Sequence, residues 1–247
     1  MAARARLPPM KLAALIFDVD GTLADTERDG HRPAFNAAFA ETGLPWVWDE
    51  ALYGELLQVT GGKERIRHYC ERCQANTVLR PDFEDLVASL HRNKTRHYLA
   101  RVESGAIPLR PGVARLIGQA RAAGLRLGIA TTTSAENVSA LIRASLAPDA
   151  TDWFELIAAG DVVPAKKPAP DIYHYVLARM ALPAGACLAL EDSGNGLAAS
   201  RAAGIPTVVT VNDYSRGQDF AGALAVLPGL DAVGLDDLLR LHQDGHL

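Results

Sequence analysis

Cysteine, aromatic residues and an excess of either charge are all scarce in this 247-residue sequence. Its three cysteines, Cys70, Cys73 and Cys187, are too few and odd in number for a disulfide framework, so we expect a cytoplasmic protein in a reducing compartment. Lys and Arg total 25 against 29 Asp and Glu, which gives a net charge of -4. Without a basic field to attract phosphate backbones or anionic lipids, neither nucleic acid nor a membrane surface is expected as a partner.

Long hydrophobic runs are also absent. No stretch approaches the roughly 18 to 20 apolar residues that span a bilayer, and the run at 12–17 ends at Asp18, too early for a secretory signal. Residues 1–9 are predicted to form a loose tail, and Met10 is a candidate for the biological start. With 49% hydrophobic residues the chain can bury one substantial core and a smaller second domain, and we expect a monomer.

Short apolar runs recur along the chain and are typical of buried parallel strands. They lie at 12–17, 125–130, 154–159, 186–190 and 207–211. Helical periodicity lies between them, as in Val113, Leu116, Ile117 and Ala120, which are spaced i, i+3, i+4 and i+7. Strands that alternate with helices predict a doubly wound, Rossmann-like α/β fold with a mostly parallel sheet covered on both faces.

Residues from about 26 to 103 interrupt this alternation with helix-like stretches and no convincing strand. The stretches are 33–42, 50–58, 63–73 and 82–101. In open α/β sheets the ligand crevice lies outside the carboxyl ends of the strands, so an insert directly after the first strand should cover it. We predict an α/β catalytic core from residues 1–23 and 105–247, and a helical cap from residues 24–104 that decides substrate specificity.

Polar side chains follow the predicted strands where each one ends. Asp18 and Asp20 follow the first strand, Thr131 the second, Lys167 lies in the loop after the third, and Glu191-Asp192 follow the fourth. Carboxylates, a hydroxyl and an ammonium group suit Mg²⁺ and a phosphoryl group. We expect the metal ligands to be Asp18, Asp192 and the backbone carbonyl of Asp20, while Glu191 either binds the metal or orients Asp192.

These residue types also predict a reaction. Asp18 is placed for in-line attack on phosphorus, which forms an acyl phosphate that water can cleave. Asp20 would protonate the leaving oxygen and later accept a proton from the attacking water. Lys167 and the Thr131 hydroxyl would hold the phosphoryl oxygens, and Gly21 would let the chain turn sharply beside them.

Four segments carry a resemblance to a known family. DVDGT at 18–22, Thr131 after an apolar strand, Lys167 before Pro168 and LEDS at 190–193 resemble, in order, the four motifs of the haloacid dehalogenase (HAD) superfamily. More narrowly, the stretches at 17–32, 60–66, 130–134 and 165–173 resemble the CbbY type, which is related to β-phosphoglucomutase. This resemblance implies a Mg²⁺-dependent phosphatase that converts xylulose 1,5-bisphosphate, an inhibitory by-product of Rubisco in the Calvin cycle, to xylulose 5-phosphate and phosphate.

The cap is expected to recognise this small phosphorylated sugar. By resemblance Glu27, His31 and Tyr53 line the sugar cavity, and Thr132 joins Thr131 at the substrate. A bisphosphate needs a second cationic pocket, and backbone donors and cations come together in one short segment. That segment contains Gly61, Gly62, Lys63 and Arg65. Gly30 and Pro33 depart from the family pattern, which leaves the direction of His31 open.

Simpler interpretations stand beside the functional ones. Thr131 could be an ordinary helix N-cap, Lys63 and Arg65 a solvated helix face, and Lys166 an exposed loop charge. Cys70 and Cys73 have redox or zinc spacing but lack a second ligand pair. Packing is the simplest role for Trp46, Trp48, Tyr173 and Tyr175.

Two alternative functions also remain. A β-phosphoglucomutase would return the phosphoryl group to a second hydroxyl of the sugar. A signalling receiver also accepts phosphate on an aspartate in a doubly wound domain, although it has no use for a helical cap or for Asp20.

Overall fold

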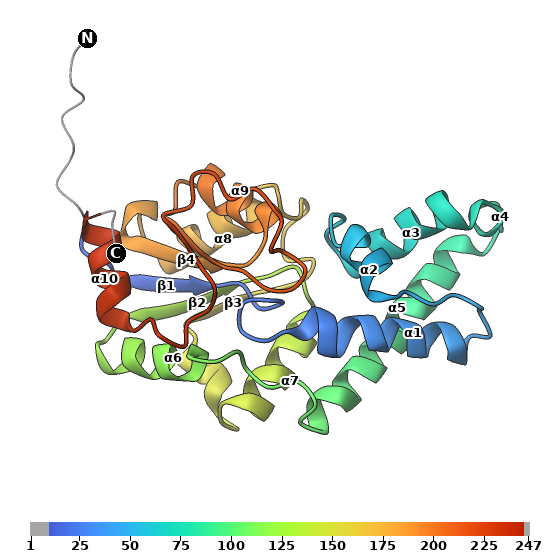
Figure 1. Cartoon of the computed structure of the whole chain (residues 1–247), viewed down its shortest axis with the longest axis horizontal. Helices are drawn as coiled ribbons and strands as arrows, with labels where there is room; N and C mark the ends of the chain where they lie inside the picture. The colour runs from blue at the N-terminus through green and yellow to red at the C-terminus, as the bar shows by residue number, and fades with distance from the viewer. Residues whose placement is uncertain (1–9, 245–247) are drawn as a thin grey trace, which may run out of the picture.

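A parallel sheet forms the centre of the protein (Figure 1). The computed structural model describes residues 10–244, so the predicted tail at 1–9 lies outside the described residues. Within them, six strands run in the order β3-β2-β1-β4-β5-β6, and every neighbouring pair is parallel. The strands are β1 (Ala14–Phe17), β2 (Arg126–Ala130), β3 (Leu156–Ala158), β4 (Cys187–Glu191), β5 (Thr207–Thr210) and β6 (Ala225–Leu227). The predicted doubly wound fold is confirmed.

Helices cover both faces of the sheet, which is why its strands are apolar throughout. In β1, Leu15 and Phe17 belong to one hydrophobic cluster, while Ala14 and Ile16 belong to another. The first cluster is completed by α6 (Val113–Ala122), α7 (Ala135–Ser145) and α10 (Leu235–Asp244). The second is completed by α8 (Asp171–Met180) and α9 (Gly194–Ala202). Burial on both faces replaces the alternating pattern of a half-exposed strand with a continuous apolar run.

The segment between β1 and β2 is helical, as predicted. It contains the π-helical turn η1 (Glu27–His31), α1 (Arg32–Glu41), α2 (Glu50–Leu56), α3 (Gly62–Cys73), α4 (Ala75–Val78) and α5 (Phe83–Glu103). These helices gather beyond the carboxyl ends of the strands (Figure 1). Trp46, Trp48 and Tyr53 are buried in an aromatic cluster of their own, which agrees with the packing role predicted for the tryptophans.

Pro33 fits this segment because of where it lies. It is the second residue of α1, but the chain is already helical at His31, and the carbonyl of Asp29, four residues before Pro33, accepts from Nε of Arg101 at 2.6 Å instead. The turn before it is a π-helix, in which the N–H of Arg32 donates to the carbonyl of Glu27. The π-helical turn places His31 directly before α1. Nothing in the sequence indicated this turn.

The long helix α5 joins the helical segment to the sheet. Val87 and Leu90, in its first half, belong to the aromatic cluster, while Tyr98 and Val102, in its second half, belong to a cluster of the sheet. None of the helices described within residues 10–244 combines the length and the hydropathy that a membrane span requires.

Candidate functional site

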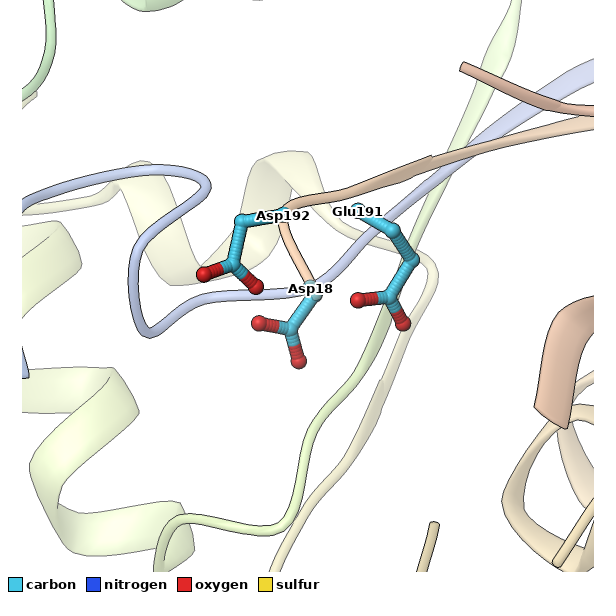
Figure 2. A group of neighbouring side chains, drawn as sticks. All are labelled: Asp18, Glu191 and Asp192. Atoms are coloured by element: carbon cyan, nitrogen blue, oxygen red, sulfur yellow. The ribbon is translucent and has the colours of Figure 1, made fainter. Parts of the chain in front are cut away.

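Three carboxylates meet at the carboxyl edge of the sheet (Figure 2). Asp18 directly follows β1, Glu191 is the last residue of β4, and Asp192 comes next. Because β1 and β4 are neighbours, with Phe17 in register with Leu190, their ends bring these side chains together. Each residue offers one oxygen, and these oxygens all lie within 4.8 Å of one another.

The Lys167 ammonium group links the ends of three strands. Its Nζ donates to Oδ1 of Asp18 at 2.7 Å, to Oε1 of Glu191 at 2.6 Å and to the carbonyl of Ala130 at 2.8 Å. The side chain is 5% exposed. Lys167 thus connects β1, β2 and β4 and adds one buried positive charge to the carboxylates.

The neighbouring Lys166 was expected to be an exposed loop charge, which is wrong. Its side chain is half-buried and donates to Oδ1 of Asp161 at 2.7 Å. Lys166 therefore lies beside Gly61 and lines the smaller of two cavities at this edge.

The electrostatics of the carboxylates favour a bound cation. Burial raises the pKa of the Asp18 carboxyl, and although Lys167 opposes this, Glu191 and Asp20 add to it, so that the pKa is about 7. Burial, followed by the charges of Asp18 and Glu191, raises the pKa of Asp192 well above its usual value. Oε2 of Glu191 is buried with no hydrogen-bond partner among the described residues. Mutually repelling carboxylates with an unpartnered oxygen fit a hard divalent ion such as Mg²⁺.

The turn after Asp18 packs tightly against Asp192. Gly21 has a φ of +85°, and a Cβ there would lie 2.2 Å from Oδ2 of Asp192. That oxygen accepts from Nδ2 of Asn212 at 2.6 Å. Only glycine combines this backbone conformation with such an approach. The predicted sharp turn is present, and Asn212 is a site residue that sequence reasoning missed.

Asp20 lies beside the carboxylates and is held by the helical segment. Its Oδ1 accepts from Oγ1 of Thr26 at 2.6 Å and lies 3.0 Å from Nε2 of His31. Burial opposes ionisation of Asp20, but His31, the Thr26 hydroxyl and Lys94 outweigh it and lower its pKa to about 2. His31 therefore faces Asp20, and its ring stacks on Tyr98 with a centroid distance of 4.3 Å.

The other predicted sugar-cavity residues form a buried cluster above Asp20. The Tyr53 hydroxyl donates to Oε2 of Glu27 and accepts from Nη1 of Arg65 at 2.8 Å. Arg65 is 6% exposed, so a solvated helix face is wrong for this residue. Lys63 points elsewhere, with its half-exposed Nζ 3.9 Å from Oδ2 of Asp161.

Lys94 is a buried cation that sequence reasoning missed. Its side chain is 4% exposed, and its Nζ lies 5.0 Å from the ring centroid of Phe35 and 5.4 Å from that of Tyr98. A sequence signal existed, because Lys94 shares the apolar stripe of α5 with Val87, Leu90 and Tyr98.

Two cavities with shared walls connect the sheet edge to the helical segment. The larger, about 660 Å³, reaches Asp18, Lys167, Glu191 and Asp192. The smaller, about 80 Å³, lies between the helical segment, which contributes Gly61, Gly62, Lys63, His91 and Lys94, and the segments after β2 and β3. The residues that line both cavities are Asp20, Glu27, Arg65 and Thr132. Most of the predicted site residues thus line one continuous region, whereas Tyr53 and Thr131 line neither cavity.

Thr131 does not cap the helix that follows it. Ser134 caps α7 by accepting from the N–H of Asn137, so an N-cap role for Thr131 is wrong. Thr131 lies directly after β2, is buried, and its Oγ1 accepts from the N–H of Thr133 at 3.4 Å.

The predicted packing role of Tyr173 accounts for its buried ring but not for its hydroxyl group. Its hydroxyl donates to Oε1 of Glu191. Cys70 and Cys73 lie on α3, buried and exposed respectively, and the metal-type cluster found among the described residues is the acidic one. A zinc or redox role for the cysteine pair therefore has no support.

Known proteins are similar to this chain in sequence and in fold. A model of haloacid dehalogenase-like hydrolases matches residues 12–204. The plasmid CbbY protein of Cupriavidus necator is 54% identical over 219 residues, which are 89% of this chain and 86% of that protein. A crystal structure of a CbbY variant from Rhodobacter sphaeroides, in complex with xylulose-(1,5)bisphosphate, has a TM-score of 0.84 at 44% identity and covers 92% of this chain and 99% of that one. A β-phosphoglucomutase from Clostridium difficile covers 94% of this chain and 97% of that one, with a TM-score of 0.76 at 18% identity, which shows the fold alone.

Proposed function

The chain belongs to the haloacid dehalogenase-like hydrolases as a sugar-phosphate phosphatase, and we propose that it is a Mg²⁺-dependent enzyme that hydrolyses xylulose 1,5-bisphosphate to xylulose 5-phosphate and phosphate. The observation that carries the proposal is the Asp18 carboxylate beside Lys167 in a cavity that continues to the cations under the helical segment. The cellular role would be removal of a sugar bisphosphate that inhibits Rubisco.

We assign residues 24–104 to a specificity cap and residues 1–23 and 105–247 to the catalytic core. Both parts line the larger cavity, since Gly54 and Leu57 come from the cap and Asn212 and Ser215 from the core. The cysteines are all free, as is usual in a reducing compartment, and we propose a monomeric, cytoplasmic enzyme.

Asp18 is the proposed nucleophile. Its carboxylate lies at the end of β1 in contact with Lys167, which can also hold a phosphoryl oxygen as negative charge shifts during transfer. Attack forms an aspartyl phosphate and releases the sugar oxygen, and water then cleaves the anhydride. Asp18, Asp192 and the backbone carbonyl of Asp20 would hold Mg²⁺, which would polarise the phosphoryl group as a Lewis acid and offset the charge of the nucleophile. Glu191 lies at the same cluster, and the hydroxyl of Thr131, which directly follows β2, is a proposed donor to the phosphoryl oxygens.

Asp20 is the proposed general acid and base. Its lowered pKa of about 2 gives the ionised form, which can accept a proton from the attacking water. Protonation of the leaving oxygen requires the acid form instead. A phosphate dianion next to Asp20 raises the pKa of this carboxyl by like-charge repulsion, so substrate binding itself supplies the needed shift.

The smaller cavity is the proposed site of the second phosphate. Lys63, His91 and Lys94 line it, and Arg65 lines both cavities. Glu27 lines both cavities and is placed to contact the sugar hydroxyls between the two phosphates, while the buried Tyr53 and Arg65 hold its carboxylate. Asp161 lies 3.9 Å from Lys63 and Glu27 lies 3.6 Å from Arg65, whereas the buried Lys94 has no ion-pair partner among the described residues. A second phosphate would supply that partner, which favours a bisphosphate.

A mutase is the remaining alternative, because it would use the same nucleophile and return the phosphoryl group to a second hydroxyl. The likeness to β-phosphoglucomutase is one of fold and does not favour that reaction. Membership in a hydrolase family removes the receiver-domain alternative.

Phosphate release from a panel of sugar mono- and bisphosphates, with Mg²⁺ or with EDTA, tests the proposal. We expect xylulose 1,5-bisphosphate to give the highest kcat/KM, with activity lost in EDTA and in Asp18→Asn. A higher kcat/KM for another sugar phosphate would remove the substrate assignment. Conversion of β-glucose 1-phosphate to glucose 6-phosphate without free phosphate would establish the mutase instead.

A further inference from the structure

The Tyr173 hydroxyl reaches into the carboxylate cluster from outside the site motifs. Tyr173 is the third residue of α8, is fully buried, and donates to Oε1 of Glu191. The same oxygen accepts from Nζ of Lys167 at 2.6 Å, and that Nζ lies 5.2 Å from the centroid of the Tyr173 ring. One tyrosine therefore contacts both the acid at the end of β4 and the lysine that joins it to Asp18.

We propose that Tyr173 is a positioning residue for phosphoryl transfer, which holds Glu191 in the orientation that keeps Lys167 on Asp18 and keeps the carboxylate in the acidic cluster with Asp18 and Asp192. This inference rests on the proposed function. Tyr173 acts through Glu191 and Lys167 and does not itself contact the substrate.

The surroundings of Glu191 limit which donors reach its two carboxylate oxygens. The carboxylate is fully buried, and its Oε1 accepts both available donors while Oε2 has none among the described residues. The opposite side is closed by Gly196, where a Cβ would lie 1.9 Å from Oε2. Without the hydroxyl, one face of the carboxylate has no donor and the group can rotate about its last torsion.

The hydroxyl is a dependable donor. A tyrosine hydroxyl carries its proton in the neutral pH range and faces a carboxylate oxygen here, so it acts as the donor. Loss of the hydroxyl leaves Lys167 as the remaining donor to Glu191 and draws the ammonium group away from Asp18. Metal binding and phosphoryl transfer should weaken together.

Tyr173→Phe removes the hydroxyl and keeps the ring. We expect the Kd for Mg²⁺, measured by titration calorimetry on the enzyme without substrate, to rise about tenfold. With saturating Mg²⁺, kcat should fall about tenfold while KM changes less than about twofold, because the hydroxyl acts through Glu191 and Lys167 on the phosphoryl group as it is transferred. Tyr175→Phe is the matched control, since this half-buried tyrosine packs on the same helix and its hydroxyl bonds to no described residue.

A double-mutant cycle separates positioning from packing. In a Glu191→Gln background we expect Tyr173→Phe to change the Mg²⁺ Kd by less than about twofold, because its partner is already altered. A tenfold change in both backgrounds would overturn the proposal, as would a Tyr173→Phe enzyme with parental Kd and kcat. A thermal midpoint in EDTA several degrees below that of Tyr175→Phe would assign Tyr173 to packing. Calorimetry decides these outcomes even if the parent releases phosphate from none of the sugars, a result that would refute the proposed function alone.

Discussion

Lys94 carries a charge that depends on pH close to the working range of an enzyme. Burial lowers its pKa, and although Glu27 and Asp20 oppose the shift, the pKa falls to about 8. Lys167 behaves differently, since Asp18 and Glu191 outweigh the effect of burial and raise its pKa. Above pH 8 the smaller cavity therefore loses one cation while the ammonium group next to Asp18 keeps its charge.

We predict that kcat/KM for a sugar bisphosphate falls about tenfold or more between pH 8 and 10, because a buried charged hydrogen bond contributes about 1.5–3 kcal/mol. The substrate phosphates are already dianions there, so the decline comes from the enzyme. Lys94→Arg keeps its charge and should flatten the profile over this interval, even if its absolute kcat/KM is lower. Parallel declines in the parent and in Lys94→Arg would show that another group is responsible.

Asp20 should be needed for hydrolysis of the aspartyl phosphate with every substrate. It should be needed for phosphorylation of Asp18 only when the leaving group requires a proton. We predict that Asp20→Ala lowers turnover of a sugar phosphate by about 10²–10⁴, because both proton transfers lose their catalyst. p-Nitrophenol leaves without a proton, so p-nitrophenyl phosphate should still phosphorylate Asp18 and give a burst of about one equivalent per enzyme before slow hydrolysis. Rapid quenching with acid measures the covalent phosphate.

Asp18→Asn is the control for this experiment, because it has no nucleophile and should give neither burst nor covalent phosphate. A steady rate without a burst in Asp20→Ala, at the parental level, would exclude Asp20 from proton transfer.

The residues that sequence alone could locate are those tied to strand ends. Asp18, Asp192 and Lys167 lie in short segments next to apolar runs, so parallel topology brings them together without knowledge of the packing. Lys94 and Tyr173 lie inside helices, where a polar group in an apolar stripe gives no indication of what it faces. Their partners Asp20 and Glu191 lie 74 and 18 positions away in the sequence, and tertiary packing alone makes them neighbours.

At the level of secondary structure, the start of α9 is shaped to receive Glu191. Ser193 caps the helix by accepting from the N–H of Gly196, and Gly196 presents its bare Cα to the Glu191 carboxylate. A Cβ at this position would lie within 2.5 Å of both carboxylate oxygens. Since Lys167 and Tyr173 pin the carboxylate from the other side, it cannot simply move aside.

We predict that Gly196→Ala lowers kcat by at least about tenfold, because the added methyl group pushes Glu191 off Lys167. Gly118→Ala is the matched control. Gly118 is exposed in the middle of α6 with no described atom within 4 Å of a Cβ, so this change should keep parental kcat and raise the unfolding free energy by roughly 0.5–1 kcal/mol. Equal kcat in the two variants would show that the close approach at Gly196 has no catalytic consequence.

The strands that sequence alone could predict are those whose residues are apolar throughout. β1, β2, β4 and β5 are buried on both faces and stand out as runs, while β6 is three residues long, with Val226 49% exposed, and was not predicted. Helix α10 was also missed, although Leu235, Leu238 and Leu241 lie three residues apart. The spacing of these leucines is the signal that could have identified the helix.

At the scale of the whole molecule, polar contacts join the cap to the core in addition to the apolar packing of α5. Nδ2 of Asn195, at the start of α9, donates to the carbonyl of Gln58 and to Oγ1 of Thr60 in the cap, both at 3.2 Å. Arg28 reaches Asp213 at 3.0 Å. Since cap and core residues together line the larger cavity, substrate must pass between them, and these contacts bear on how firmly the cavity is closed over it.

Asn195 offers a way to weaken this closure without touching the chemistry. Its two hydrogen bonds are at least partly exposed, so each contributes about 0.5–1.5 kcal/mol at most. We predict that Asn195→Ala raises KM for the substrate about fivefold, with kcat within about twofold of the parent and the thermal midpoint almost unchanged, because the closed arrangement loses stability relative to an open one. Steady-state kinetics and a thermal melt measure these quantities.

The two acceptors allow the effect to be divided. Gln58→Ala keeps the backbone carbonyl that accepts from Asn195, so it should leave KM at the parental value, whereas Thr60→Val removes one acceptor and should give a rise smaller than that of Asn195→Ala. If these hydrogen bonds hold the cap closed, KM should increase in the order Gln58→Ala, Thr60→Val, Asn195→Ala. If Gln58→Ala raised KM as much as Asn195→Ala, the effect would come from general disturbance of the loop between α2 and α3, and the cap would be held closed by its other contacts with the core.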